Sequence, residues 1–341
     1  MFRLGAVGLA LLIAACDDTP VTLEISGETM GTTYNITAVA PAGGLDSEAL
    51  KAAVEATLAQ VNASMSNWDP GSEISRFNAL RHTEPVPISA GLADVIEAAD
   101  EIHSRSDGLF DLTLAPLIEL WGFGAREAGD PIPSEAEISA ALEQVGQSRI
   151  ITLTRGPDTL QKARPDASIY LAAIGKGHGV DEVAATLRGL GLQDFMVEIG
   201  GDLFASGQSP GNEPWRIGIE RPDATDRALQ EIIELSSQGM ATSGDYRNYF
   251  EEDGIRYSHI IDANTGRPIT HKTASVTVIA ETAMLADGWA TAMLVLGRER
   301  GLEIAEAYDL AVFFISRSDA LDDKDFAVTA STRFQALQAE K

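Results

Sequence analysis

The sequence predicts a mixed α+β fold in which strands and helices do not form regular βαβ units. Helix-like and strand-like segments alternate irregularly along the 341 residues. Hairpin patterns stand towards both ends of the chain, and no short repeat or low-complexity block interrupts them. Irregular alternation with hairpins favours antiparallel strands with packed helices over a doubly wound parallel sheet.

The N-terminal part predicts a hairpin followed by a helix. Residues 23–27 and 33–39 alternate polar and apolar side chains, which is typical of two half-buried antiparallel strands. Residues 28–32 join them as a turn with small residues at its tip. After a Gly-rich loop, Leu50, Val54, Leu58, Val61 and Met65 form one apolar stripe, so we expect an amphipathic helix there.

The remaining elements follow from apolar periodicity and turn residues. Apolar stripes or capping signals predict helices at 72–78, 92–102, 116–120, 134–145, 176–187 and 285–294. Short apolar or alternating runs predict strands at 150–153, 167–171, 194–199, 215–220, 257–262, 275–279 and 310–315. The residues after 323 carry little pattern.

The composition excludes one class of partner. The chain has 25 Lys and Arg against 51 Asp and Glu, a formal charge of −26. Nucleic-acid binding needs a basic surface, so we expect no nucleic-acid partner. A phosphate ligand would have to be held locally, by a lysine, a helix N-terminus or a metal.

The first residues predict export and lipid attachment. Residues 1–15 contain Arg3 and an apolar run that is short for a membrane span, as in a signal peptide. The run ends in Ala14-Ala15-Cys16, which resembles a bacterial lipobox, and Cys16 is the only cysteine. The alternative is an ordinary cleaved signal with an incidental cysteine.

These features predict an extracytoplasmic, lipid-anchored protein. We expect residues 16–22 to tether one domain, residues 23–335, to the membrane through the lipid on Cys16. Asp17 and Asp18 follow that cysteine, and an Asp there resembles an inner-membrane retention signal. The expected location is therefore the periplasmic face of the inner membrane.

A carboxylate in an apolar helix is the first candidate site. Asp287 lies within an almost wholly apolar stretch, where an ionised carboxylate is costly unless it is paired or bound to a metal. Thr291 lies one helical turn further, so both oxygens share a face. Two hard oxygens on one face suit Mg²⁺ or Ca²⁺. The alternative is a buried Asp that caps a neighbouring loop.

A Gly-rich turn is the second candidate. Residues 172–181 read as a strand end, a glycine turn and a helix start, with Lys176 at the mouth. Glycines allow a ligand close to the backbone, and helix starts favour phosphate. The spacing is not that of a P-loop, and a purely structural turn is the alternative.

Trp68 and His259 are isolated candidates for ligand binding and catalysis. Trp68 lies in a turn-rich segment, where it could stack on a planar ligand or simply cover the core. His259 has an ordinary pKa suited to a general base, although a hydrogen-bonded histidine at a strand end is the alternative. The other histidines have no partners at metal-ligand spacing, so we expect no zinc site.

Eight segments together resemble a known family. They occur in family order at residues 30–34, 65–78, 110–116, 172–181, 198–202, 242–246, 259–268 and 286–291. The chain is thereby similar to the ApbE-type flavin transferases, also called FAD:protein FMN transferases. The resemblance runs from about residue 24 to 314.

The resemblance implies a fold and a reaction. Family members have a T-fold-like α+β architecture, and their reaction depends on Mg²⁺. FAD is the substrate and is split at its pyrophosphate. FMN passes to a Ser or Thr hydroxyl of an acceptor protein as a phosphoester, and AMP leaves. Typical acceptors are outward-facing subunits of membrane redox complexes.

The resemblance also implies roles for individual residues. Asp287, Thr291 and the carbonyl of Ala173 correspond to metal ligands, with Ala290 where relatives often carry another Asp. His259 corresponds to the histidine proposed to assist transfer, and Lys176 to the residue that reaches the nucleotide. The implied flavin or nucleotide contacts are Met30, Trp68, the backbone of Thr113, Leu114 and Ala115, Tyr170 in place of a common Asp, and Ile261.

Two other functions remain open at this level. The same site with water in place of the acceptor would hydrolyse FAD to FMN and AMP. A tethered flavin-binding lipoprotein without catalytic activity is the second alternative.

Overall fold

We analysed a computed structural model of the chain. It describes residues 19–123, 131–222, 228–246, 248–252, 255–318 and 326–339. Residues 1–18, which include Cys16 and the expected signal peptide, lie outside the described residues. Within the described part, no helix is both long and apolar enough to cross a membrane.

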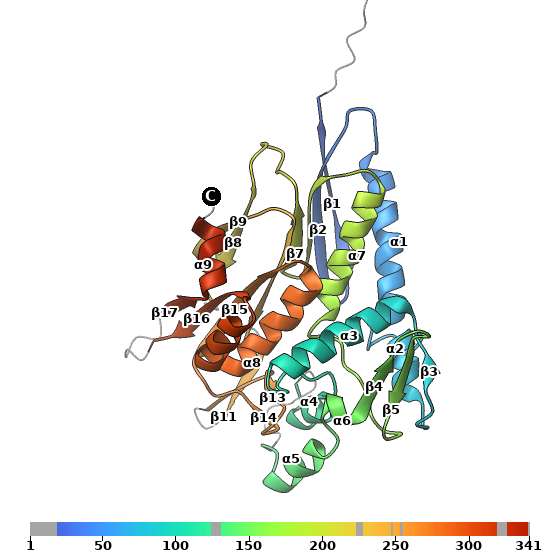
Figure 1. The fold of residues 1–341 in the computed structure, drawn as a ribbon, viewed down its shortest axis with the longest axis vertical. Coiled ribbons are helices and arrows are strands. Elements are labelled where there is room, and N and C mark those ends of the chain that lie inside the picture. Colours follow the sequence, from blue (N-terminus) through green and yellow to red (C-terminus); the bar gives the residue numbers. More distant parts are fainter. Residues whose placement is uncertain are drawn as a thin grey trace, which may run out of the picture.

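The fold is organised around one large antiparallel sheet (Figure 1). Its strand order is β1-β2-β6-β7-β10-β15-β16-β17, and every neighbouring pair is antiparallel. The strands are β1 (Val21–Thr29), β2 (Thr32–Ala40), β6 (Asp194–Ile199), β7 (Asp202–Ser206), β10 (Gln238–Gly244), β15 (Thr273–Ala280), β16 (Ala311–Arg317) and β17 (Phe326–Ala330). The α+β expectation is therefore confirmed, since no βαβ unit joins parallel strands in this sheet.

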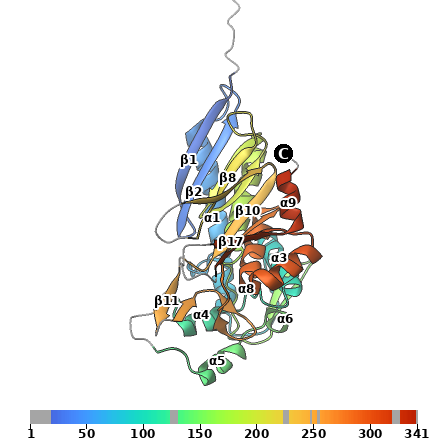
Figure 2. The same ribbon diagram turned by 90° about the vertical axis from the view of Figure 1, so that its left-hand side faces the viewer.

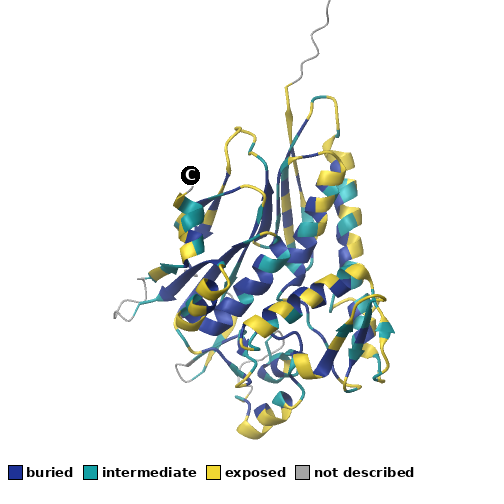
Figure 3. Ribbon diagram, in the orientation of Figure 1, coloured by how far each residue is buried: buried dark blue, intermediate teal, exposed yellow. Residues whose placement is uncertain are grey.

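Three long helices cover one face of the sheet. They are α1 (Ser47–Met65), α7 (Gly175–Gly189) and α8 (Ala283–Ala307), with α7 lying between the other two. The stripe predicted for α1 is its buried face. Helix α8 is buried along most of its length because α3 (Ala90–Arg105) packs against its outer side (Figure 3). Its carboxylate at position 287 is thus enclosed by the protein.

The opposite face has its own apolar layer. The hairpin of β8 (Trp215–Glu220) and β9 (Leu229–Leu235) packs there together with α9 (Thr332–Ala339). Figure 2 shows this second layer from the side. Strand β17 and helix α9 fall after residue 323, where the sequence predicted nothing, because the apolar pattern of these edge elements is short.

The smaller elements gather below the sheet in Figure 1. They include α2 (Glu73–Ala79), α4 (Ala115–Trp121), α5 (Glu135–Leu142), α6 (Gln147–Ile150) and the sheet of β3 (Val86–Pro87), β5 (Thr159–Lys162) and β4 (Ile151–Thr154). Two short hairpins complete them, β11 (Tyr249–Glu252) with β12 (Ile255–Ser258) and β13 (Ile261–Asp262) with β14 (Arg267–Pro268).

Two sequence-based expectations are corrected. Residues 167–171, all of them described, form no strand. The side-chain amides of Asn67 and Asn78 bind their backbone in place of a neighbouring strand, and the carbonyl of Leu112 accepts the Tyr170 amide. The predicted strand 257–262 is two pieces, because His259 and Ile260 leave the β11–β12 ladder. The His259 amide nevertheless still donates to the carbonyl of Asn248 at 3.1 Å, so His259 stays beside the hairpin.

Candidate active site

The close crossing of α7 and α8 creates the site. A Cβ on Gly177 would lie 2.2 Å from the carbonyl oxygen of Ala283, so only glycine permits this approach. The Gly177 amide donates to Oδ2 of Asp287 at 3.0 Å. The Asp181 carboxylate accepts the amides of Ala283 and Met284, both at 2.8 Å, and so caps the start of α8 from α7.

The crossing gathers three charged side chains. Lys176 forms an ion pair with Asp202 and lies 3.8 Å from Oδ1 of Asp287. Both carboxylates are almost fully buried. Burial lowers the pKa of Lys176, but the charges of Asp287 and Asp202 outweigh burial and raise that pKa above its usual value. Burial and the neighbouring charge of Asp287 raise the pKa of Asp202.

These carboxylates fit a hard divalent cation. Two buried carboxylates share one ammonium, which leaves excess negative charge. Thr291 and Ala173 line the same cavity as Asp287, so carboxylate, hydroxyl and carbonyl oxygens are available. Among the described residues there is no cluster of three or more His, Cys, Asp and Glu that could hold a metal. A cation here would therefore rely on neutral oxygens beside Asp287.

Two cavities meet at this cluster. The larger, about 350 Å³, is within the range of small-molecule sites. The smaller is about 200 Å³. Tyr170, Ala172 and Lys176 line both of them. A ligand that occupied both cavities would therefore pass Lys176 at its middle.

The smaller cavity is lined by flat and flexible apolar groups. Met30 reaches it from the β1–β2 turn, where its φ of 51° and that of Gly31, 73°, form the tight corner. Trp68 and Tyr170 meet edge to face with ring centroids 6.3 Å apart. Trp68 is 83% exposed, so it is not a lid on the core. Such a wall suits a planar ring.

His259 lies at the larger cavity, and one of its ring nitrogens makes a hydrogen bond to the backbone. Its Nδ1 is 2.9 Å from the carbonyl oxygen of Asn248, and a carbonyl only accepts. Nδ1 therefore carries the proton, and in the neutral ring Nε2 keeps its lone pair. Burial lowers the pKa of His259. The hydrogen bond to Asn248 and the charge of Asp245 raise this pKa, but by less than burial lowers it. The ring is then neutral at pH 7 and can accept a proton.

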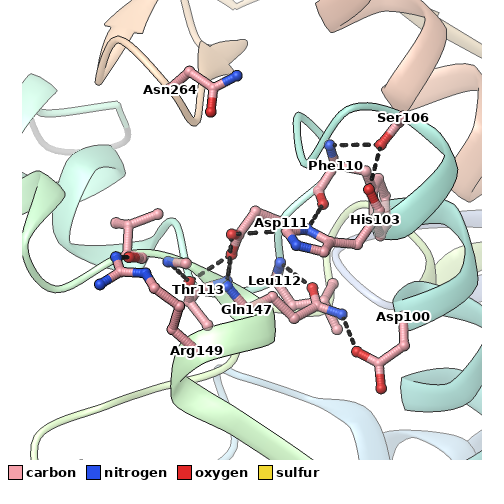
Figure 4. Close-up of polar contacts among 12 residues, drawn as sticks. Asp100, His103, Ser106, Phe110, Asp111, Leu112, Thr113, Gln147, Arg149 and Asn264 are labelled. Atoms are coloured by element: carbon pink, nitrogen blue, oxygen red, sulfur yellow. Dashed lines mark hydrogen bonds and ion pairs between the residues drawn. The ribbon is translucent and has the colours of Figure 1, made fainter.

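A buried polar network holds the wall formed by residues 110–114 (Figure 4). The carboxylate of Asp111 accepts hydrogen bonds from two backbone amides, that of Thr113 at 2.6 Å and that of Gln147 at 2.8 Å. The side-chain oxygen of Gln147 in turn accepts a hydrogen bond from the backbone amide of Leu112 at 2.8 Å. Thr113 is 1% exposed, and its hydroxyl also donates to Asp111. The network fixes this loop without placing the Thr113 side chain in either cavity.

The structure thus brings most of the predicted residues together. Those that line one or both cavities are Met30, Trp68, Leu114, Tyr170, Ala173, Lys176, His259, Ile261, Asp287 and Thr291. Thr113 and Ala115 flank Leu114 but line neither cavity. Cys16 lies outside the described residues.

Sequence reasoning missed two supporting residues. The carbonyl of Asn248 orients His259, and a carbonyl leaves no signal in the side-chain pattern. The Ser243 hydroxyl lies 3.2 Å from that of Thr291. The family-like segment 242–246 marked that region but not this contact.

Comparison with known proteins identifies the family. The sequence model of the ApbE family matches residues 30–314. The chain belongs to the ApbE family. It is 43% identical to the FAD:protein FMN transferase of Vibrio cholerae over 316 residues, covering 93% of this chain and 94% of that one. It is 41% identical to the Haemophilus influenzae protein of the same name over 340 residues, covering 98% and 97%.

Solved ApbE structures share the fold. The flavin transferase ApbE from Vibrio cholerae superimposes with a TM-score of 0.84 at 40% identity, covering 93% of this chain and 99% of that one. The apo form of the Pseudomonas stutzeri flavinyl transferase ApbE gives a TM-score of 0.83 at 40% identity, covering 94% and 97%. These similarities extend over the whole α+β architecture described above.

Proposed function

We propose that this ApbE-family chain is an FAD:protein FMN transferase. It moves FMN from FAD to a Ser or Thr hydroxyl of an acceptor protein as a phosphoester, and AMP leaves. The carrying observation is the meeting of the two cavities at Lys176 and Asp287. A dinucleotide with a ring system at each end and a pyrophosphate between them matches that arrangement.

Each described group has a part in this reaction. The Lys176 ammonium offers a fixed positive charge to a phosphate oxygen at the junction of the cavities. Nε2 of His259 takes the proton of the attacking hydroxyl. A new bond joins that hydroxyl oxygen to the FMN phosphorus while the bridging P–O bond to AMP breaks.

Mg²⁺ is the proposed cofactor. Asp287, Thr291 and the carbonyl of Ala173 would hold it, since the excess buried negative charge and hard oxygens suit this ion. When bound, it would neutralise phosphate charge and support the leaving of AMP. The buried Asp202 keeps Lys176 in place beside it.

The test is incubation of the purified chain with FAD, Mg²⁺ and a candidate acceptor domain from a membrane redox complex. An acceptor whose mass rises by one FMN phosphoester supports transfer. FMN and AMP without a modified acceptor would instead support a pyrophosphatase. Tight FAD binding without turnover, even with Mg²⁺, would leave a flavin-binding protein.

We further propose a lipid anchor on Cys16 and an extracytoplasmic location at the inner membrane. The support is the sequence of residues 1–18 together with the start of β1 at Val21, which leaves only a short tether. A Cys16→Ser variant expressed in a Gram-negative host should move from the membrane to the soluble periplasmic fraction. Retention of that variant in the membrane would contradict the anchor.

A further inference from the structure

The backbone beside Tyr170 is held by two asparagine side chains. Asn67 donates to the carbonyl of Ile169 at 2.7 Å and accepts the Leu171 amide at 2.9 Å. Asn78 accepts the Ile169 amide at 2.8 Å and donates to the same carbonyl at 2.9 Å. The two amides thus satisfy groups that a neighbouring strand would otherwise bind.

Asn67 differs from Asn78 in what it connects. It binds the residues on both sides of Tyr170 and directly precedes Trp68 in the chain. One side chain therefore joins the backbones that carry the two rings of the smaller cavity. Among the described residues the Asn78 side chain binds only Ile169, and Asn78 lies in α2 and does not line the smaller cavity.

The loop that carries Asn67 is itself fixed. The carbonyl of Ser66 accepts the Ser72 hydroxyl at 2.6 Å and the Ser75 hydroxyl at 3.0 Å. The Ser66 hydroxyl accepts the amides of Trp68 and Asp69 at 3.3 and 3.2 Å. An anchored loop can transmit the position of α2 to Trp68, whose own side chain is 83% exposed and has little packing to hold it.

We propose that Asn67 is a positioning residue for substrate binding. Its two hydrogen bonds hold Trp68 and Tyr170 in their edge-to-face arrangement, so that the smaller cavity is preformed for one planar ring of the dinucleotide. The inference rests on the proposed function for the identity of that ligand. Preorganisation reduces the cost of ordering side chains on binding, so it acts on affinity rather than on the transfer step.

The test uses FAD as the probe, without Mg²⁺ or acceptor, so that binding is measured apart from turnover. Trp121, Trp215 and Trp289 are at most 6% exposed, so acrylamide quenching in the described part reports mainly on Trp68. Asn67→Ala should weaken FAD binding about tenfold, the loss of roughly one oriented contact. Even at saturating FAD, Trp68 should remain more accessible to acrylamide in this variant than in the parent chain.

Asn78→Ala is the control, since each alanine variant removes two hydrogen bonds to this backbone segment, although Asn67 lines the smaller cavity and Asn78 does not. It should lower the melting temperature about as much as Asn67→Ala, while its FAD affinity stays within about twofold of the parent. Asn67→Asp keeps the acceptor for Leu171 but loses the donor to Ile169. It should fall between the parent and Asn67→Ala in affinity, and it keeps the test available if the alanine variant does not fold.

Equal loss of affinity in Asn67→Ala and Asn78→Ala would overturn the proposal, because it would show a general structural effect. Unchanged affinity and unchanged protection in Asn67→Ala and Asn67→Asp would overturn it as well. Failure of the parent chain to modify any acceptor would count against the proposed function alone, since the binding comparison requires only FAD.

Discussion

Nζ of Lys176 lies 3.8 Å from Oδ1 of Asp287, although the two residues come from different helices. Lys176 is in the first turn of α7, and Asp287 is in the second turn of α8. The Gly177 amide binds the other oxygen of the same carboxylate. The charge arrangement therefore depends on how closely the helices cross.

Gly177→Ala should separate the two helices. The added Cβ would overlap the backbone of Ala283, which cannot rotate away as a side chain could. We expect a loss of about 3 kcal/mol in the free energy of unfolding, at the upper end for overpacking, and a large loss of transfer activity. Urea denaturation measures the first effect, and acceptor modification measures the second.

Gly189→Ala is the control for that substitution. Gly189 ends the same helix, and nothing lies within 4 Å of the position its Cβ would take. The free energy of unfolding should stay unchanged or rise by about 0.5–1 kcal/mol because the unfolded chain loses freedom. Equal stability of the two variants would show that the crossing tolerates a side chain.

Lys176→Met should destabilise the fold as well as stop transfer. It leaves Asp202 and Asp287 buried together without a cation, and breaking a buried pair typically costs about 3–5 kcal/mol. Adding Asp202→Asn removes one of the two unpaired charges and leaves that of Asp287, so the double variant should regain part of the stability but none of the activity. A single variant as stable as the parent would contradict the shared-ammonium arrangement.

His259→Asn should lower transfer about 10²- to 10⁴-fold, the usual range for a general base. Asparagine retains an N–H for the Asn248 carbonyl but has no basic nitrogen. The fold should remain intact by circular dichroism. A variant with nearly full activity would remove His259 from the reaction.

The parent chain should show a matching pH dependence. Because burial lowers the pKa of His259 below about 6.5, the base is neutral at pH 7. Transfer should fall only as the pH drops through that lowered pKa. The neutral ring also favours the folded state above the unfolded-state pKa, and this contribution is lost on acidification. In the His259→Asn variant, the rate of any residual transfer should not show this fall at acidic pH.

The local parts of the fold could be predicted from sequence. The β1–β2 hairpin, the stripe of α1 and the capping box at Ser134 depend on neighbours in the chain, and the structure confirms them. The stretch 167–171 was wrongly expected to be a strand. Its backbone is bound by Asn67 and Asn78, about a hundred positions away, which no local pattern reveals.

Some residues of the site could likewise be predicted from local sequence, and others could not. Asp287 stood out because a carboxylate in an apolar helix requires a partner, and Lys176 stood out among glycines. Their partnership depends on the helix crossing at Gly177, which the glycine-rich turn suggested only in general terms. The pairing of Asp202 with Lys176 and the carbonyl that orients His259 became clear only with the tertiary structure.

The most direct test compares acceptor modification by the parent chain and by Asp287→Asn across a range of Mg²⁺ concentrations at saturating FAD. Asparagine can still accept the Gly177 amide, so the crossing is preserved while the ligand charge is removed. We expect Mg²⁺-dependent modification by the parent and a rate at least about 100-fold lower in the variant. Equal, Mg²⁺-dependent rates in both proteins would contradict the account.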